Sequence, residues 1–425
     1  MEPFPVHGAV IHCEQVPLPD IARAVGTPVF VYSSHAMRGR ARELRDALSG
    51  LRDPLIAYAV KANPNAAVLA TLAAEGLGAD VVSGGEYRRA RAAGIAGEKI
   101  VFSGVGKTAA EMALALEGGI GQFNLESFPE AEMLSEVALG LGRRAPAAFR
   151  VNPDVASGSH AKISTGAAHN KFGIPIGDAP AAFAQARALP GLELRGLAVH
   201  IGSQITSLAP LERAFEKVGE MIAQLRAAGH PIHTADLGGG LGVAYDPSLP
   251  PPPTPEDYGQ LVARATRDWD VRLIFEPGRL IVGEAGVLLT EVVRVKPGVS
   301  NPFLIVDAAM NDLMRPSLYE AWHSIDAVVP REERMVADVV GPICETGDTF
   351  ATSRSVERVE AGDLMIIRTA GAYAATMGST YNSRPLTPEV LVDGDRWEVI
   401  RERRDVEAFL RDENIPTWLK QSASS

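Results

Sequence analysis

The sequence predicts an α/β protein in which a (β/α)8 barrel is joined to a mostly antiparallel β-sandwich or β-barrel domain. Three features favour this fold class. Short apolar segments alternate with helix-like stretches between Leu55 and Phe275, polar residues follow each apolar segment, and turn residues replace the helix-like stretches beyond about residue 281. A doubly wound open sheet is the alternative for the first part.

The apolar segments of the first part have the length and content of buried strands. They are Leu55–Val60, Ala79–Val82, Ile100–Phe102, Gln122–Leu125, Ala147–Val151, Leu197–Ile201, Thr234–Leu237 and Arg272–Phe275. Stretches with apolar residues at helical spacing separate them, among them Asn65–Glu75, Gly84–Ala93, Thr108–Glu117 and Leu208–Ala228. This alternation predicts a parallel sheet, and the number of units fits a closed barrel.

Polar, charged and glycine residues gather where these segments end. The residues at these positions are Lys61, Ser83, Ser103, Glu126, Asn152, Gly202, Gly238 and Glu276. In a barrel the carboxyl ends of all strands lie on one face, and that face carries the active site. Ordinary turns also contain Gly, Asn and Asp, but they place Lys, His and Glu less readily after apolar strands.

The strand-like segments beyond about residue 281 indicate a β domain. They are Gly286–Val295, Pro302–Val306, Met335–Val340, Asp363–Arg368 and Val390–Val392. We expect the strand-like pieces Ala9–Ile11 and Val29–Tyr32 to join this domain, because chain termini often meet. The expected boundaries are 1–34 for the N-terminal strands, 35–280 for the barrel and 281–425 for the β domain.

The composition excludes several classes of protein. Of the 425 residues, 46% are hydrophobic and 22% are charged, which excludes disorder throughout the chain. The net charge of −11 argues against nucleic acid as a partner. We expect no membrane span and no signal peptide, because no apolar run is long enough and the N-terminus lacks a basic start. The only cysteines, Cys13 and Cys344, indicate no disulfide framework, no metal site and a cytoplasmic location.

Lys61 ends an apolar strand in the segment YAVKAN. Partial burial lowers the pKa of a lysine amine, and a lysine of this kind can form a Schiff base with a carbonyl compound. A lysine at a strand end is by itself more often only a surface charge. Its interpretation therefore depends on the residues that follow the other strands.

Gly238–Gly240 follows the strand TADL and can bring backbone N–H groups close to an anion. This pattern indicates a phosphate cradle. A dinucleotide loop is the competing interpretation, but it requires G-x-G-x-x-G leading into a helix. The sequence here continues GGGLGVAYDPSLPPPP, so NAD binding is disfavoured.

Two further strand ends carry groups that suit a flat, nitrogen-containing cofactor. Glu276 in EPGR can accept a hydrogen bond from a protonated ring nitrogen, although an ion pair with Arg279 is equally expected. His200 precedes Gly-Ser and can lie on a planar ring, although a histidine on an apolar strand is usually a core residue. Together with Lys61 and the glycines, these residues meet the requirements of pyridoxal phosphate.

The second part of the chain adds a cysteine within the loop GPICETGD. A lone cysteine is usually a buried, inert thiol. Cys344, however, lies beside Glu345 and close to Asp348 in a turn, which makes it a candidate for proton transfer. Arg315, Tyr319 and Tyr373 are further polar residues in turns, and each alone is a weak signal.

Several of these motifs occur in a family-specific order: YAVKAN, HIGSQI, DLGGG, EPGR, RPSLY, GPICETGD and GAY. In this order they resemble the diaminopimelate decarboxylases, within the alanine-racemase-like fold group of pyridoxal-phosphate enzymes. HIGSQI and the Cys-Glu pair distinguish this family from the ornithine decarboxylases, whose pair reads Cys-Asp. The chain departs from the family at His169, where Glu is commoner, and at Thr346, where Ser is usual.

The resemblance implies a role for each candidate residue. Lys61 would hold the cofactor covalently, and Cys344 would deliver the proton that replaces the carboxylate. The implied cofactor-binding residues are Lys61, His200, Ser203, Gly240, Glu276, Gly278, Arg279 and Tyr373. The implied substrate-binding residues are Arg279, Arg315, Tyr319, Glu345 and Tyr373.

The resemblance further implies the reaction and the assembly. The reaction is decarboxylation of meso-2,6-diaminopimelate to L-lysine and CO2, the last step of lysine biosynthesis. The implied assembly is a homodimer in which Cys344 and Glu345 reach the active site of the other subunit. Three alternatives stay open: a decarboxylase of another basic amino acid or of a siderophore precursor, an amino-acid racemase, and a non-catalytic pyridoxal-phosphate-binding protein. A racemase is expected to place a cation at the ring nitrogen, and the non-catalytic proteins lack a β domain.

Overall fold

The computed structural model describes residues 2–158, 160, 162, 165–166 and 170–420. His169 therefore lies outside the described residues. The chain divides into two compact units. The barrel unit comprises residues 1–3, 33–286 and 368–376, and the β unit comprises residues 4–32, 287–367 and 377–425.

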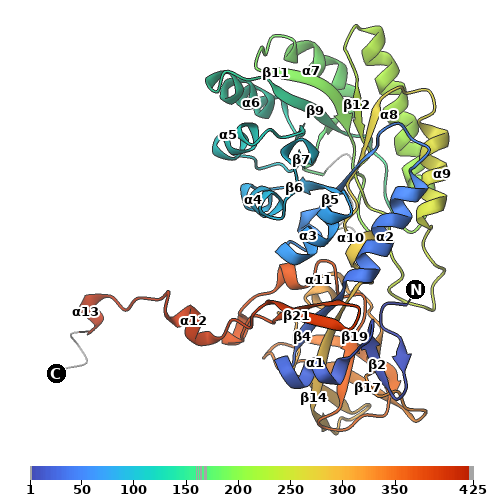
Figure 1. The fold of residues 1–425 in the computed structure, drawn as a ribbon, viewed down its shortest axis with the longest axis vertical. Helices are drawn as coiled ribbons and strands as arrows, with labels where there is room; N and C mark the ends of the chain where they lie inside the picture. Colours follow the sequence, from blue (N-terminus) through green and yellow to red (C-terminus); the bar gives the residue numbers. More distant parts are fainter. Residues whose placement is uncertain (1, 159, 161, 163–164, 167–169, 421–425) are drawn as a thin grey trace. The chain divides into compact units, whose positions relative to one another are not determined.

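The barrel unit is built on a closed ring of parallel strands (Figure 1). The ring strands are β5 (Leu55–Ala59), β6 (Gly78–Val81), β7 (Ile100–Phe102), β8 (Gln122–Leu125), β9 (Ala145–Asn152), β11 (Leu192–Ala198), β12 (Thr234–Asp236) and β13 (Arg272–Phe275). The ring closes because β13 pairs with β5, and β10 (Ile174–Pro175) pairs with β9 outside it. The predicted barrel is confirmed, and the doubly wound alternative is wrong.

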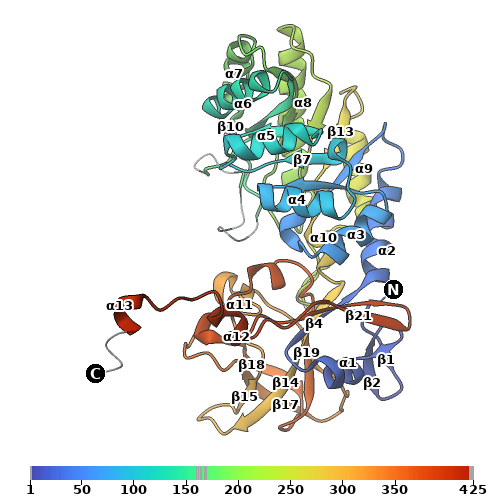
Figure 2. The same cartoon turned by 60° about the vertical axis from the view of Figure 1, so that its left-hand side comes forward.

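Helices surround these strands on the outside of the barrel (Figure 2). The outer helices are α2 (Ser34–Ala47), α3 (Ala66–Ala74), α4 (Gly84–Ala92), α5 (Ala109–Glu117), α6 (Phe128–Gly140), α7 (Ala179–Ala186), α8 (Ala209–Ala227) and α9 (Pro255–Ala265). The unit also contains the short helix α10 (Arg279–Val282) and the 3-10 turns η1 (Val60–Ala62), η2 (Gly97–Lys99) and η4 (Ile176–Asp178). Ser83, Thr108 and Ser127 cap three of these helices by accepting backbone N–H groups. Ser83, one of the polar strand-end residues, therefore has a local structural role.

The β unit contains a small sheet and a large mixed sheet. The strands are β1 (Val6–His7), β2 (Val10–Cys13), β3 (Val16–Pro17), β4 (Val29–Ser33), β14 (Gly286–Lys296), β15 (Phe303–Val306), β16 (Ile325–Ala327), β17 (Arg334–Val340), β18 (Thr349–Glu357), β19 (Leu364–Ile367), β20 (Glu389–Asp393) and β21 (Arg396–Arg401). The helices are α1 (Leu18–Val25), α11 (Arg315–Tyr319), α12 (Val406–Leu410) and α13 (Thr417–Lys420), with the turns η5 (Ala375–Met377) at the unit boundary and η6 (Tyr381–Ser383). Most pairings are antiparallel, but β15 and β17 run parallel.

One segment lies apart from its neighbours in the sequence. Residues 368–376 cluster with the barrel unit, whereas the expected boundary at 280/281 assigns them to the β domain. Two backbone hydrogen bonds hold the segment there. Gly371 N–H donates to Gly283 O at 3.0 Å, and Tyr373 N–H donates to Ala62 O at 2.8 Å. Tyr373 is thereby brought next to the turn that carries Lys61.

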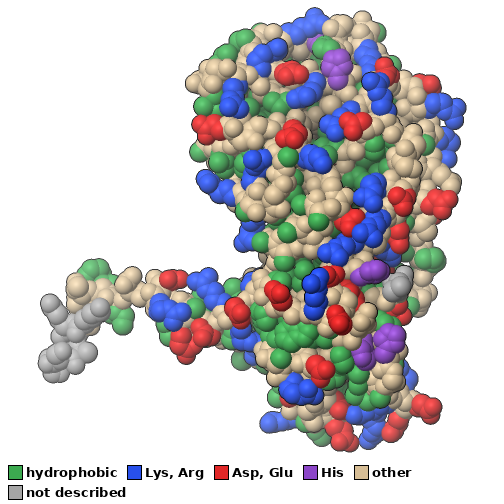
Figure 3. Space-filling view, in the orientation of Figure 1, with side chains coloured by type: hydrophobic (Ala, Val, Ile, Leu, Met, Phe, Trp, Pro, Cys, Tyr) green, Lys and Arg blue, Asp and Glu red, His purple; other side chains and the backbone are tan. Residues whose placement is uncertain are grey.

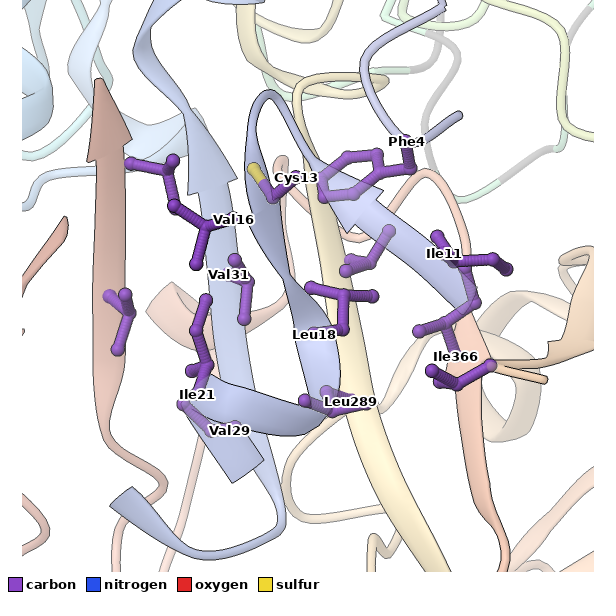
Figure 4. Packing of buried hydrophobic residues seen from close by; sticks show 14 residues of the cluster. Phe4, Ile11, Cys13, Val16, Leu18, Ile21, Val29, Val31, Leu289 and Ile366 are labelled. Carbon is purple, nitrogen blue, oxygen red and sulfur yellow. The ribbon is translucent and has the colours of Figure 1, made fainter. Parts of the chain in front are cut away.

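The β unit has its own hydrophobic core, which includes Cys13 (Figure 4). Phe4, Val16, Leu289 and Ile366 belong to the same buried cluster. Burial, with a contribution from the charge of Glu14, raises the pKa of the Cys13 thiol well above its ordinary value. Cys13 is therefore a core residue rather than a reactive thiol.

The surface shows no dominant charge on the face drawn in Figure 3, where basic and acidic side chains are interspersed. Within the described residues, no helix is long and apolar enough to cross a membrane.

Candidate active site

Lys61 lies in η1, directly after β5, and its amine contacts an acid from the next strand. Lys61 Nζ donates to Asp80 Oδ2 at 3.1 Å, and the side chain of Asp80 is fully buried. Burial disfavours the lysine charge, but the negative charge of Asp80, supported by Tyr373 and Glu276, outweighs it and raises the pKa of Lys61. Burial by itself lowers this pKa as predicted, but the predicted net lowering is wrong, because the charge of Asp80 makes the overall shift upward.

Gly238–Gly240 passes closely over the ends of the neighbouring strands. A Cβ atom on Gly239 would lie 2.0 Å from the carbonyl oxygen of Glu276. A Cβ atom on Gly240 would lie 2.3 Å from the carbonyl oxygen of Gly202, and Gly240 has a φ of +112°. Only glycine fits these two positions, so the loop presents bare backbone at the carboxyl ends of the strands.

His200 follows β11 and contacts this loop. Its Nδ1 accepts a hydrogen bond from the Gly239 N–H at 3.2 Å, so a neutral ring carries its proton on Nε2. Burial, followed by the positive charges of Arg150 and Lys61, lowers the pKa of His200 well below its ordinary value. The imidazole is therefore neutral near pH 7 and suited to packing against a flat ring.

Glu276 follows β13 and is a buried carboxyl group. Its Oε1 accepts hydrogen bonds from Ser103 Oγ at 3.2 Å and Asn124 Nδ2 at 3.4 Å. Burial raises the pKa of Glu276 well above its ordinary value, and the charges of Asp236 and Asp80 add to this effect. No ion pair joins Glu276 to Arg279, both of which are described residues, so that alternative finds no support.

Arg279 is buried among hydroxyl groups and aromatic rings. It donates from Nη2 to Ser203 Oγ at 3.1 Å and from Nη1 to the Tyr245 hydroxyl. Its guanidinium carbon lies 4.8 Å from the ring centre of Tyr373. Arg279 Nε is buried and has no hydrogen-bond partner among the described residues, so this cation keeps donor capacity for an anionic ligand.

The remaining barrel-unit residues of the predicted site lie close to these groups. Tyr373 has a φ of +53° and is held there by its backbone bond to Ala62 O. A Cβ atom on Gly278 would lie 3.2 Å from the Tyr373 hydroxyl. The structure thus brings together the predicted residues of the barrel unit: Lys61, His200, Ser203, Gly240, Glu276, Gly278, Arg279 and Tyr373.

The other predicted residues belong to the β unit. Cys344 is exposed, which contradicts the alternative of a buried thiol, and its N–H donates to Asn382 Oδ1 at 3.3 Å. Glu345 Oε1 accepts a hydrogen bond from the Tyr381 hydroxyl at 2.5 Å. Buried Asp348 shapes the loop that carries both residues, because its carboxyl oxygens accept the N–H groups of Met310 at 2.6 Å and Ile343 at 2.7 Å.

Arg315 and Tyr319, the last two predicted residues, form the ends of α11 in the β unit. Arg315 is 5% exposed, and its Nε donates to His323 Nε2 at 3.3 Å. A buried arginine bonded to a neutral histidine ring keeps its positive charge.

Three polar residues of the barrel interior were missed by the sequence analysis. Asp80, Asn124 and Asp236 lie within β6, β8 and β12 and surround Lys61 and Glu276. The available signal was a charged or amide residue in the middle of an otherwise apolar segment, as in ADVV, QFNL and TADL. Such a residue must find a buried partner.

Known proteins resemble this chain over nearly its whole length. Residues 36–283 match the family described as "Pyridoxal-dependent decarboxylase, pyridoxal binding domain". The chain is 55% identical over 421 residues to a diaminopimelate decarboxylase of Zymomonas mobilis, covering 99% of this chain and 100% of that protein. It belongs to the diaminopimelate decarboxylase family.

Solved structures agree with this assignment. A diaminopimelate decarboxylase from Helicobacter pylori complexed with L-lysine has a TM-score of 0.89 and 39% identity, covering 96% of this chain and 100% of that one. One from M. jannaschii in co-complex with L-lysine has a TM-score of 0.94 and 33% identity, covering 98% of each chain.

Proposed function

We propose that this chain converts meso-2,6-diaminopimelate into L-lysine and CO2 with pyridoxal phosphate as its cofactor. One observation carries the proposal. Lys61, the Gly238–Gly240 loop and Glu276 meet at the carboxyl ends of the barrel strands, in a chain 55% identical to a diaminopimelate decarboxylase. The β unit with its exposed Cys344 argues against a non-catalytic carrier of the cofactor.

The barrel unit fits the cofactor. The glycine loop leaves bare backbone where a phosphate needs donors, and Ser203 and the backbone of Gly278 and Arg279 lie beside it. Lys61 is the amine for the aldehyde, and neutral His200 can pack on the ring. When bound, pyridoxal phosphate accepts the electron pair left by the departing CO2.

The residues of the chain prepare this chemistry. Asp80 orients the Lys61 amine and stabilises its charged form. Glu276 holds a proton at its carboxyl group, because burial and neighbouring acids raise its pKa, and this proton is available to a ring nitrogen. Arg279, Ser203 and Tyr373 bind the anionic part of the cofactor.

The substrate has an amine and a carboxylate at its far end, so recognition needs an anion and a cation together. Glu345 binds the distal ammonium, and Arg279 or Arg315 binds the distal carboxylate, with Tyr319 and Tyr373 completing the site. Lysine and ornithine lack the distal carboxylate and would leave an arginine unpaired. Cys344 donates a proton from Sγ to the carbon that loses CO2.

The proposed site is shared between two subunits. Lys61 belongs to the barrel unit, whereas Cys344 and Glu345 belong to the β unit, and we propose that the partner subunit supplies the second pair in a homodimer. The cytoplasmic location stays a prediction from the sequence.

The direct test is a substrate panel. The purified chain, loaded with pyridoxal phosphate, is incubated separately with meso-diaminopimelate, lysine, ornithine and arginine, and the CO2 and amine products are measured. We expect lysine and CO2 from meso-diaminopimelate and far slower release from the others. Equal or faster release from ornithine, lysine or arginine would assign the chain to another basic amino acid. Absence of any release would indicate a non-catalytic protein.

A further inference from the structure

A series of buried polar side chains runs through the interior of the barrel unit. Thr234 Oγ1 donates to Gln122 Oε1 at 2.8 Å, and Gln122 Nε2 donates to Asn124 Oδ1 at 2.9 Å. Asn124 Nδ2 then donates to Asp236 Oδ2 at 2.8 Å. All four residues are buried, and each hydrogen bond points towards Asp236. The mechanism described above uses none of them.

This series fixes which groups face the two acids at its end. The Asn124 oxygen is engaged by Gln122, so its NH2 group must face Asp236 and Glu276. The other oxygen of Asp236 accepts the Gly238 N–H at 2.9 Å. Both oxygens of Asp236 therefore receive amide donors, which stabilise its ionised form.

Asp236 Oδ2 and Glu276 Oε1 both accept from Asn124 Nδ2, at 2.8 Å and 3.4 Å, so the two buried carboxyl groups lie side by side. Two buried carboxylates this close to each other repel when both are ionised, which favours a state in which one of the two groups carries a proton. Because Asp236 has two amide donors and Glu276 has weaker contacts to Ser103 and Asn124, the proton belongs on Glu276.

We propose that Asp236 is a positioning residue that holds the Glu276 carboxyl group through a single shared proton, with the donor series from Thr234 keeping Asp236 ionised. The inference rests on the proposed role of Glu276 towards the cofactor ring nitrogen. It adds that the cofactor-free protein stores one proton beside this position and that Asp236 determines where the carboxyl group points.

The surrounding charges are consistent with a shared proton. Burial is the main effect that raises the pKa of Asp236, to about 6, and Asp80 adds to it, whereas the hydrogen bonds from Glu276, Asn124 and Gly238 oppose it. Lys61 lowers the pKa of Glu276 but does not overcome burial and the two acids. Burial, together with the negative charge of Asp236, also raises the pKa of Tyr258 in α9.

The stored proton has a definite effect on stability. Both acids have a higher pKa in the folded chain than in the unfolded chain, so folding takes up a proton. The contribution of Asp236 is complete below its ordinary pKa, 3.8, and is lost as the pH rises through about 6, and the contribution of the Glu276 proton is lost as the pH rises through the raised pKa of Glu276. The cofactor-free protein should therefore lose stability across this range because of these two residues.

Two substitutions of Asp236 separate the effect of the shared proton from the effect of positioning Glu276. Asp236→Asn keeps the shape of the side chain and loses the shared proton. The amides of Asn124 and Gln122 turn over and Thr234 accepts, so that the new NH2 group donates to Asn124 and to an ionised Glu276. Asp236→Ala removes both the side-chain contact and the shared proton. In Asp236→Asn we expect the pH-dependent loss of thermal stability between about pH 4 and 7 to be smaller than in wild type. In Asp236→Ala we expect the dissociation constant for pyridoxal phosphate to rise about tenfold, with Asp236→Asn close to wild type.

The control is Asp312→Asn, which alters a buried acid of the β unit and should leave cofactor affinity unchanged. A wild-type pH profile in Asp236→Asn would overturn the shared proton. Equal cofactor affinities in the Asn and Ala variants, whether high or low, would overturn the positioning role.

If Asp236→Ala does not fold, Glu276→Gln replaces it as the second variant. We expect Glu276→Gln to lose the pH dependence of thermal stability and the infrared band of a protonated carboxyl group. Retention of either one would overturn the proposal. The stability and infrared measurements need no substrate, so they remain valid if the proposed decarboxylation fails.

Discussion

At the scale of single residues, the amine of Lys61 is set by its contact with Asp80. The 3.1 Å contact keeps the amine charged and pointed into the site of the barrel unit. We predict that Lys61→Ala loses the visible absorbance of the bound cofactor, because Lys61 is the amine that lies beside Asp80 and Glu276. Borohydride reduction followed by mass analysis checks this. A reducible cofactor adduct in the variant would show that Lys61 is not the attachment residue.

The second prediction for a single residue concerns Glu345 and the distal ammonium of the substrate. Glu345→Ala should raise the KM for meso-diaminopimelate about tenfold or more, because the distal ammonium loses a charged partner, while cofactor affinity changes little. Tyr381→Phe is the matched control, since it removes the hydroxyl that bonds Glu345 but keeps the carboxylate. An unchanged preference among diaminopimelate, lysine and ornithine in Glu345→Ala would remove this residue from the substrate site.

The sequence predicted the residues at strand ends better than those within strands. Lys61, His200 and Glu276 stood out because charged groups interrupted the chain where apolar segments stopped. Asp80, Asn124 and Asp236 did not, because their partners come from other strands and can be identified only once the ring is closed. The raised pKa of Lys61 was missed for the same reason.

At the scale of elements, the loop after β12 requires glycine at Gly239 and Gly240. Gly240→Ala should abolish or strongly weaken cofactor binding, because its Cβ atom would lie 2.3 Å from the Gly202 carbonyl oxygen at a φ of +112°. Gly106→Ala is the control, since no atom lies within 4 Å of its added Cβ. Cofactor titration of both variants measures the effect, and wild-type affinity in Gly240→Ala would mean that the loop does not form the cradle.

The elements themselves were largely predictable from local pattern. The barrel strands are short, apolar and bounded by glycine or polar residues, so each one was visible by itself. Strand direction in the β unit was not visible, because alternation of apolar residues is the same in parallel and antiparallel strands. For this reason the parallel pairing of β15 with β17 was missed.

At the scale of the whole molecule, the division of the proposed site between two units makes subunit exchange informative. Lys61→Ala and Cys344→Ala variants, each nearly inactive, should regain about a quarter of wild-type activity when mixed equally. Half of the dimers are then hybrids, and each hybrid has one intact site. Native mass spectrometry confirms that exchange has taken place. Hybrid dimers that stay as inactive as their parents would refute the shared site.

We propose that this chain, with a cofactor held on Lys61, releases CO2 from meso-diaminopimelate and leaves lysine. The most direct measurement follows isotopically labelled meso-diaminopimelate with the loaded protein and quantifies CO2 and lysine together, with Lys61→Ala alongside. We expect equal amounts of CO2 and lysine from the wild-type protein and almost none from the variant. Unaltered diaminopimelate with the wild-type protein, or equal turnover by the variant, would contradict the proposal.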